Sequence, residues 1–283
     1  MRPRIITAES SGFCFGVRRA IDIAEKTAKR KRLIYSLGPL IHNPQEVKRL
    51  EKIGIKVIDK PEGLRDSVMI LRTHGIPQGL KEKLKSQNLL LVDATCPFVK
   101  RAQDIVQKQA KSDKRIVIVG EKSHPEVKAL VSYGGKKCFV AEKYSDLKKI
   151  NLSGDVCVVS QTTQAPENFS KFVRKIKSAN RNVKIFDTIC RATIDRQSAA
   201  KKLSKRVDVM LVVGGKNSGN TKRLAQICSE FAMTHYIESA RELKKSWFNN
   251  KNLIGITAGA STPDWIIKEV KKKAARILKN KGQ

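Results

Sequence analysis

Short apolar runs rich in β-branched residues alternate along the chain with stretches in which apolar residues recur every three or four positions. The runs predict strands at Arg4–Thr7, Leu33–Ser36, Val68–Leu71, Leu89–Val92, Arg115–Val119, Val156–Ser160, Val183–Phe186, Val209–Val213 and Leu253–Thr257. Amphipathic stretches that predict helices follow most of them, such as Val17–Lys29, Val99–Lys111 and Thr193–Lys205. Apolar strands that alternate with helices are typical of parallel sheets, so we expect an α/β protein. Ligands bind such sheets at the carboxyl ends of the strands.

The cysteines reveal an internal repeat. Cys14 begins CFGVRRAIDI and Cys96 begins CPFVKRAQDI, and the two segments share Val, Arg, Ala, Asp and Ile at equal offsets. Cys190 begins the weaker match CRATIDRQ. Internal similarity of this kind can fix the architecture of a chain.

Polar residues repeat with the cysteines. A count of 28 residues forward from each cysteine reaches His42, His124 and Ser218, and a glycine stands four residues before each: Gly38, Gly120 and Gly214. A later polar position recurs as His74, Thr162 and Ser261, each after an apolar run and before a proline. The shared spacing predicts three related α/β units over residues 1–96, 97–190 and 191–283. Arranged around a pseudo-threefold axis, they would bring the three cysteines together inside a polar ring.

Three convergent thiolates suit a metal centre. The choice lies between zinc and an iron–sulfur cluster, and spacing alone does not separate the two. A [4Fe–4S] cluster held by three cysteines would leave one iron open to a substrate oxygen. Cys138, Cys157 and Cys228 fall outside the repeat and are interpreted as small buried apolar residues.

The polar ring favours an anion. The turn Gly214–Asn220 (GGKNSGN) offers backbone amides beside a predicted helix start, where phosphates bind. Glu126, two residues after His124, is a candidate general acid. Its alternative role is that of an ordinary first-turn glutamate stabilised by the helix dipole.

These segments resemble the 4-hydroxy-3-methylbut-2-enyl diphosphate reductase family, also called IspH or LytB. The matching stretches are SGFCFGV, GPLIHNP, THGIP, DATCP, HPEV, SQTT, DTIC, KNSGN and TAGASTPD, which run in family order from residue 11 to residue 264. The chain departs from the family at Ile194, where threonine is common, and at Gly219, where a hydroxyl residue is frequent.

The resemblance implies a fold, a reaction and a set of residues. The fold is a trefoil of three α/β units around a central iron–sulfur cluster, and the reaction is reductive removal of the substrate's allylic hydroxyl. The products are isopentenyl and dimethylallyl diphosphate, in the last step of the non-mevalonate isoprenoid pathway. The implied cluster is one [4Fe–4S] per chain with ligands Cys14, Cys96 and Cys190. The implied substrate-binding residues are His42, His74, His124, Thr162, Ser218, Gly219, Asn220 and Ser261, and the implied catalytic residues are Glu126 and Thr162.

Composition raises one competing function and suggests a partner. The chain has 283 residues with 58 Lys and Arg against 26 Asp and Glu, a net charge of +32. Such a charge favours nucleic-acid binding, but aromatics are only 5% and no nucleic-acid-binding motif is found. We therefore expect no nucleic-acid partner, and interpret the charge as suited to a diphosphate and an acidic electron donor such as ferredoxin or flavodoxin. A three-cysteine zinc hydrolase acting on a phosphorylated substrate is the remaining alternative.

The sequence also predicts a location. No run of about 18 apolar residues occurs, and the first ten residues lack a signal-peptide core, so we expect a cytoplasmic protein without a membrane partner. In a reducing cytosol, six cysteines indicate metal or redox chemistry more often than disulfides.

Overall fold

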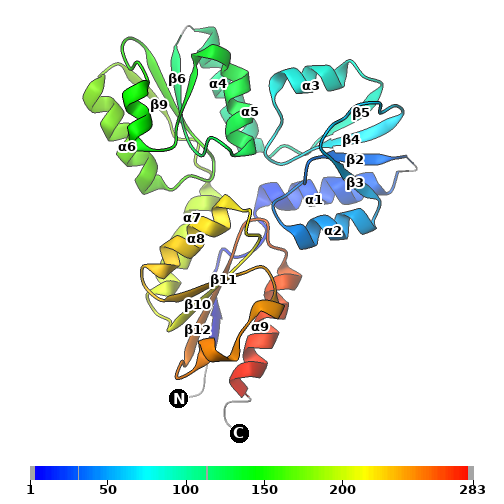
Figure 1. Cartoon of the computed structure of the whole chain (residues 1–283), viewed down its shortest axis with the longest axis vertical. Coiled ribbons are helices and arrows are strands. Elements are labelled where there is room, and N and C mark those ends of the chain that lie inside the picture. Colours follow the sequence, from blue (N-terminus) through cyan, green and yellow to red (C-terminus); the bar gives the residue numbers. More distant parts are fainter. Residues whose placement is uncertain (1–3, 31, 113, 280–283) are drawn as a thin grey trace. The chain divides into compact units, whose positions relative to one another are not determined.

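The computed structural model describes residues 4–30, 32–112 and 114–279. Within these ranges the strands form three four-stranded sheets, all of whose pairings are parallel (Figure 1). The predicted α/β class with parallel sheets is thus confirmed. The chain packs as two compact bodies that we describe separately: body A comprises 4–18, 41–49 and 191–279, and body B comprises 19–40 and 50–190 of the described residues. Of the described helices, none has both the length and the apolar character that a membrane span requires.

The first sheet lies in body B. Its strands are β2 (Ile34–Leu37), β3 (Ile55–Ile58), β4 (Ser67–Leu71) and β5 (Leu89–Asp93), in the spatial order β3-β2-β4-β5. Every residue of β4 is buried, as its unbroken apolar run requires for an inner strand. Helix α3 (Gln78–Lys85) packs Leu84 against Met69 and Leu71. Helices α1 (Phe15–Ala28) and α2 (Pro44–Lys52) contribute residues to both bodies.

The second sheet, also in body B, is covered on both faces. Its strands are β6 (Arg115–Val119), β7 (Cys138–Ala141), β8 (Val156–Ser160) and β9 (Val183–Phe186), in the order β7-β6-β8-β9. Helices α4 (Pro97–Lys111) and α5 (Pro125–Gly134) pack on the face that carries Ile116 and Val159. Helix α6 (Pro166–Ala179) packs Phe172 on the opposite face, which carries Val117 and Val158. Two short 3-10 helices, Gly135–Lys137 and Tyr144–Lys149, flank β7.

The third sheet lies in body A. Its strands are β10 (Val209–Val213), β11 (Met233–Ile237), β12 (Leu253–Ala258) and β1 (Arg4–Thr7), in the order β11-β10-β12-β1. Alternate residues of β10 face two different layers: Met210 faces α7 (Arg191–Ser204) and α8 (Gly219–Ser229), and Leu211 faces α9 (Asp264–Lys279). Two 3-10 helices, Ala240–Glu242 and Lys245–Phe248, precede β12.

The three sheets share one topology, and this corrects the predicted place of the first strand. In chain order each sheet reads second, first, third and fourth strand, but the fourth strand of the third sheet is β1, from the opposite end of the chain. Arg4 pairs with Leu253, so Arg4–Thr7 belongs with the sheet of unit 191–283 and not with unit 1–96. A four-residue apolar strand does not encode its partner, whereas β12 needs a neighbour on its second edge. The boundaries after residues 96 and 190 stay predictions.

Candidate functional site

The three repeat cysteines occupy equivalent places in the three sheets. Each follows the fourth strand of a sheet and directly precedes a helix, and the backbone amide of each donates to a carbonyl oxygen two residues beyond the third strand of that sheet. The donor–acceptor distances are 3.2 Å for Cys14 to Ala260 in body A, and 3.0 Å for Cys96 to Thr73 and for Cys190 to Thr162 in body B. The repeat found in the sequence is thus matched by a repeated backbone hydrogen bond, which fixes the position of each cysteine's backbone relative to its sheet.

The six cysteines fall into two chemical groups. Cys14, Cys96 and Cys190 are half-buried at strand ends, and the structure places no described cysteine in a disulfide. Cys138, Cys157 and Cys228 lie in apolar clusters, where burial raises the pKa of each thiol to about 12 and keeps it neutral. Metals bind the thiolate, so the strand-end cysteines are the ligand candidates, and three thiols fit either an iron–sulfur cluster or zinc.

Two histidines of body B meet ring to ring. The rings of His74 and His124 have centroids 5.4 Å apart at 82° to each other, an edge-to-face contact. Thr73 Oγ1 lies 3.4 Å from His74 Nδ1. The backbone carbonyl of Thr73 also accepts a hydrogen bond from the Cys96 amide. The residue beside the His74 ring is therefore hydrogen-bonded to one of the three repeat cysteines.

His124 also begins helix α5. It is the N-cap residue, and its Nδ1 accepts from the backbone amide of Glu126 at 3.2 Å, while Pro125 at the first helical position needs no acceptor. A ring nitrogen that accepts is unprotonated, so the proton of the neutral ring lies on Nε2. The segment H-P-E therefore presents a histidine N–H donor and a glutamate at one helix start.

Glu126 is the buried acid of body B. Its side chain is 1% exposed; Thr162 N donates to Oε1 at 2.7 Å and Thr162 Oγ1 donates to Oε2 at 2.8 Å. Burial raises the pKa of Glu126 to about 7, and the two bonds from Thr162 oppose that rise because they stabilise the carboxylate. A carboxyl group with this pKa exchanges its proton near neutral pH, which suits a general acid.

The turn Gly214–Asn220, predicted to be an anion cradle, lies in body A. Ser218 is the N-cap of α8 and its Oγ accepts from the Thr221 amide at 3.3 Å, with Gly219 at the first helical position. Asn220 follows and is 6% exposed; its amide nitrogen and oxygen have no hydrogen-bond partner among the described residues. A buried amide with neither atom bonded is rare and points to a ligand as the missing partner.

His42 and Ser261 lie beside this cradle in the same body. Ser261 Oγ donates to the His42 carbonyl at 3.1 Å. A Cβ atom on Gly215 would lie 2.6 Å from that carbonyl oxygen, so only glycine allows the turn to approach the His42 backbone this closely. The body therefore brings together His42, Ser218, Gly219, Asn220 and Ser261, and body B brings together His74, His124, Glu126 and Thr162.

An anchoring group behind the cradle was not predicted from the sequence. The Tyr236 hydroxyl donates to the Gly215 carbonyl; Glu238 Oε1 accepts from the Lys216 amide at 2.6 Å, and Glu242 Oε2 pairs with Lys216 Nζ at 3.2 Å. Gln45 Nε2 also donates to the Glu238 carbonyl at 2.7 Å. These residues carry no motif and act only through contacts that are long-range in sequence. The one available signal was an acidic pair placed just after a strand in a strongly basic chain.

One repeat position shifts by a residue. The spacing groups Thr162 with His74 and Ser261, but the carbonyls that accept from the repeat cysteines Cys96, Cys190 and Cys14 belong to Thr73, Thr162 and Ala260. Thr162 is therefore equivalent to the residue before His74 and before Ser261. The difference places the threonine hydroxyl against Glu126.

Comparison with known proteins gives one consistent result. The family model described as LytB protein matches residues 5–275. A 4-hydroxy-3-methylbut-2-enyl diphosphate reductase from Campylobacter hominis is 49% identical over 273 residues, which cover 95% of this chain and 98% of that protein. The similarity thus extends over essentially the full length of both chains.

Comparison with solved structures also finds diphosphate reductases. A structure of (E)-4-hydroxy-3-methyl-but-2-enyl diphosphate reductase, the terminal enzyme of the non-mevalonate pathway, is 43% identical with a TM-score of 0.73, covering 97% of this chain and 99% of that one. The E-1-hydroxy-2-methyl-but-2-enyl-4-diphosphate reductase from Plasmodium falciparum is 30% identical with a TM-score of 0.91, covering 98% of this chain and 88% of that one.

Proposed function

This chain belongs to the LytB protein family, and from that premise we propose that it is a 4-hydroxy-3-methylbut-2-enyl diphosphate reductase. The reaction removes the allylic hydroxyl of (E)-4-hydroxy-3-methylbut-2-enyl diphosphate. The carbon–oxygen bond breaks, two electrons and two protons are taken up, and the oxygen leaves as water. The products are isopentenyl diphosphate and dimethylallyl diphosphate, and the step is the last of the non-mevalonate isoprenoid pathway.

The observation that carries the chemistry is the buried Glu126–Thr162 pair. A hydroxyl leaves readily only after it gains a proton, and Glu126 has a pKa of about 7 with its carboxyl bonded to the Thr162 hydroxyl. In its protonated form Glu126 donates to Thr162 Oγ1, which frees the threonine proton for a substrate oxygen. Glu126 is thus the proposed proton source and Thr162 the proposed relay and substrate contact.

The proposed diphosphate ligands are the polar residues at helix starts and strand ends. They are His42, His74, His124, Ser218, Gly219, Asn220 and Ser261. In support, His124 and Ser218 are N-caps of α5 and α8, where helix dipoles favour an anion. Asn220 offers an amide whose hydrogen bonds no described residue supplies. The backbone amide of Gly219 adds a donor that needs no side chain.

The proposed cofactor is one [4Fe–4S] cluster per chain, held by Cys14, Cys96 and Cys190. When bound, such a cluster supplies the electrons and, with three protein ligands, leaves one iron open to the substrate oxygen. The equivalent strand-end positions of the three thiols support this assignment. Thiolate ligands require reducing conditions, so we propose a cytoplasmic location and an acidic protein, a ferredoxin or flavodoxin, as electron donor.

Anaerobic purification with metal analysis tests the proposal. We expect a brown protein with about four irons per chain, which forms both products when a small reductant is supplied. Cys96→Ser should lose most of the iron, whereas the matched control Cys138→Ala, at a neutral thiol outside the repeat, should keep it.

The zinc alternative makes the opposite prediction. A colourless protein that contains zinc, with Cys96→Ser as active as the unaltered chain, would contradict the reductase. Retention of iron by Cys96→Ser together with loss by Cys138→Ala would contradict the ligand assignment.

A further inference from the structure

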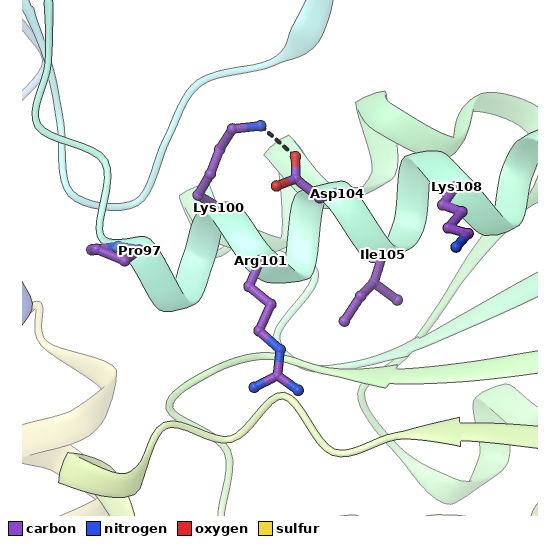
Figure 2. A pocket seen from close by; sticks show the side chains of 6 residues that line it. All are labelled: Pro97, Lys100, Arg101, Asp104, Ile105 and Lys108. Atoms are coloured by element: carbon purple, nitrogen blue, oxygen red, sulfur yellow. Dashed lines mark hydrogen bonds and ion pairs between the residues drawn. The ribbon is translucent and has the colours of Figure 1, made fainter.

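Helix α4 carries an open hollow along its outer face. The helix begins directly after Cys96, its N-cap residue. The hollow measures about 370 Å³ and its lining comes entirely from this helix: Pro97, Lys100, Arg101, Asp104, Ile105 and Lys108 (Figure 2). A surface feature therefore extends from the backbone of a proposed cluster ligand along one helix.

The charge of this face is strongly positive. Three cations line it against one carboxylate, and that carboxylate, on Asp104, is paired with Lys100 (Figure 2). Arg101 and Lys108 are exposed and have no ion pair or hydrogen bond with any residue that the structure describes. Their charge is therefore available to an external partner.

Apolar residues alternate with these cations. Phe98, Arg101, Ile105 and Lys108 follow one another at intervals of three or four residues, so they lie along one side of the helix. Phe98 is 37% exposed although it is a large apolar side chain. Cations around a small apolar area are what a weak, charge-steered protein encounter requires, and electron-transfer complexes belong to that class of small interfaces.

The helices that follow the other two cysteines differ in this respect. Near the start of α1 and of α7 the arginines are engaged within the protein. Their contacts are Arg18 with Asp264 (3.6 Å), Arg19 with the Thr95 carbonyl (3.2 Å), Arg191 with Asp195 (2.9 Å) and Arg196 with the Gly12 carbonyl (2.7 Å). Near the helix starts the contrast is with Arg101 of α4, which is exposed and has no ion pair or hydrogen bond with a residue that the structure describes.

We propose that the outer face of α4 is the docking surface for an acidic one-electron carrier protein of the ferredoxin or flavodoxin class. The inference rests on the proposed function, because electrons are needed at Cys96 only if it helps hold a cluster. Two reduced carriers each dock, give up one electron and leave oxidised, which supplies the two electrons of the reaction. Carboxylates of the carrier would pair with Arg101 and Lys108.

Charge reversal on α4 tests the surface. The variant is Arg101→Glu with Lys108→Glu, and the control is Lys171→Glu with Lys175→Glu, two exposed lysines on α6 that change the net charge equally. Binding of a reduced ferredoxin or flavodoxin is measured by titration at low and high salt. Turnover is measured with that carrier and, separately, with dithionite and a viologen.

The α4 variant should bind the carrier at least tenfold more weakly at low salt, with a flatter salt dependence, and the α6 control should bind within about twofold of the unaltered chain. Turnover with dithionite should stay unchanged in both. Equal weakening in both variants, or unchanged binding in the α4 variant, would overturn the docking surface. The binding arm does not depend on catalysis, so a failure of the proposed function would show separately, as no turnover with dithionite in the unaltered chain.

Discussion

The starts of helices α5 and α8 are equivalent positions with different chemistry. Both follow the first strand of a sheet, and in both the N-cap side chain accepts a backbone amide: His124 in α5 and Ser218 in α8. Two residues later, α5 has Glu126, whose carboxyl takes two hydrogen bonds from Thr162. At the same place α8 has Asn220, whose amide has no partner among the described residues.

We propose that the difference separates a chemical role from a binding role. A satisfied, desolvated carboxyl holds its proton to a higher pH than an exposed one, so its position serves proton transfer. An unsatisfied buried amide gains hydrogen bonds only when a ligand arrives, so its position serves recognition. In this proposal the same backbone design provides two functions, and the residue two positions after the N-cap decides which.

Replacing the acid should have the largest effect. Glu126→Gln keeps the size of the side chain but removes its acidic proton, so we expect turnover to fall by about 10² to 10⁴ with little change in substrate affinity. Steady-state kinetics with a small reductant measure this, and the iron content of the variant controls for folding. Turnover equal to that of the unaltered chain would instead make Glu126 an ordinary first-turn glutamate.

Removing the amide should act on binding. Asn220→Ala deletes hydrogen bonds to a charged ligand, each worth about 1.5–3 kcal/mol, so KM should rise roughly 10- to 100-fold while kcat changes little. Gln226→Ala, at an exposed position on the same helix, is the matched control and should leave KM unaltered. A fall in kcat with KM constant would contradict the assignment of substrate binding to the start of α8 and of proton transfer to the start of α5.

The smallest effect is expected at Thr162 and is best seen as a pH shift. The Thr162 hydroxyl and backbone amide both lower the pKa of Glu126 against the rise caused by burial. Thr162→Val removes the hydroxyl bond and keeps the amide bond, so it should move that pKa above about 7. A general acid works while protonated, and activity falls as pH rises through its pKa. The descending limb of the pH–rate profile should therefore move to higher pH in Thr162→Val, with turnover about tenfold lower because the hydroxyl relay is gone.

Thr162→Ser keeps the hydroxyl and supplies the control. Thr162→Ser should return the descending limb of the pH–rate profile to its position in the unaltered chain and should restore most of the turnover. A limb that stays in place in Thr162→Val would mean that a group other than Glu126 governs it.

Much of the fold follows from local pattern. The inner strands β4, β6, β8, β10 and β12 were predicted because they are continuous apolar runs buried on both faces. The second strand of each sheet, β3, β7 or β11, was missed. Each lies at a sheet edge: β3 and β11 mix polar or exposed residues into their runs, as in Met233–Ile237 (MTHYI), and β7 is a run of only four residues of which three are half-buried.

The site was predictable where residues repeat and not where contacts are long-range. The cysteine spacing identified three equivalent strand ends, and HPE identified the capped helix start with its acid. Periodicity and spacing did not predict the bond from Thr162 to Glu126, 36 residues away, and only the family resemblance implied that Thr162 lies near the acid. Nothing in the sequence predicted the anchoring of Gly215 by Tyr236. Such contacts depend on how strands and loops converge, which neither periodicity nor a motif specifies.

The pairing of β1 with β12 has a consequence for how the protein is made. On the ribosome β1 is synthesised before the other strands that the structure describes, and its partner strand β12, which begins at Leu253, is synthesised after all of them. Contacts of such high sequence separation form late, because a long loop must close first. Body B can fold during translation, whereas Cys14, whose amide is held by Ala260, reaches its final place only after the last strand is complete. We therefore expect a metal centre that uses Cys14 to be loaded only after β12 and Ala260 have been synthesised.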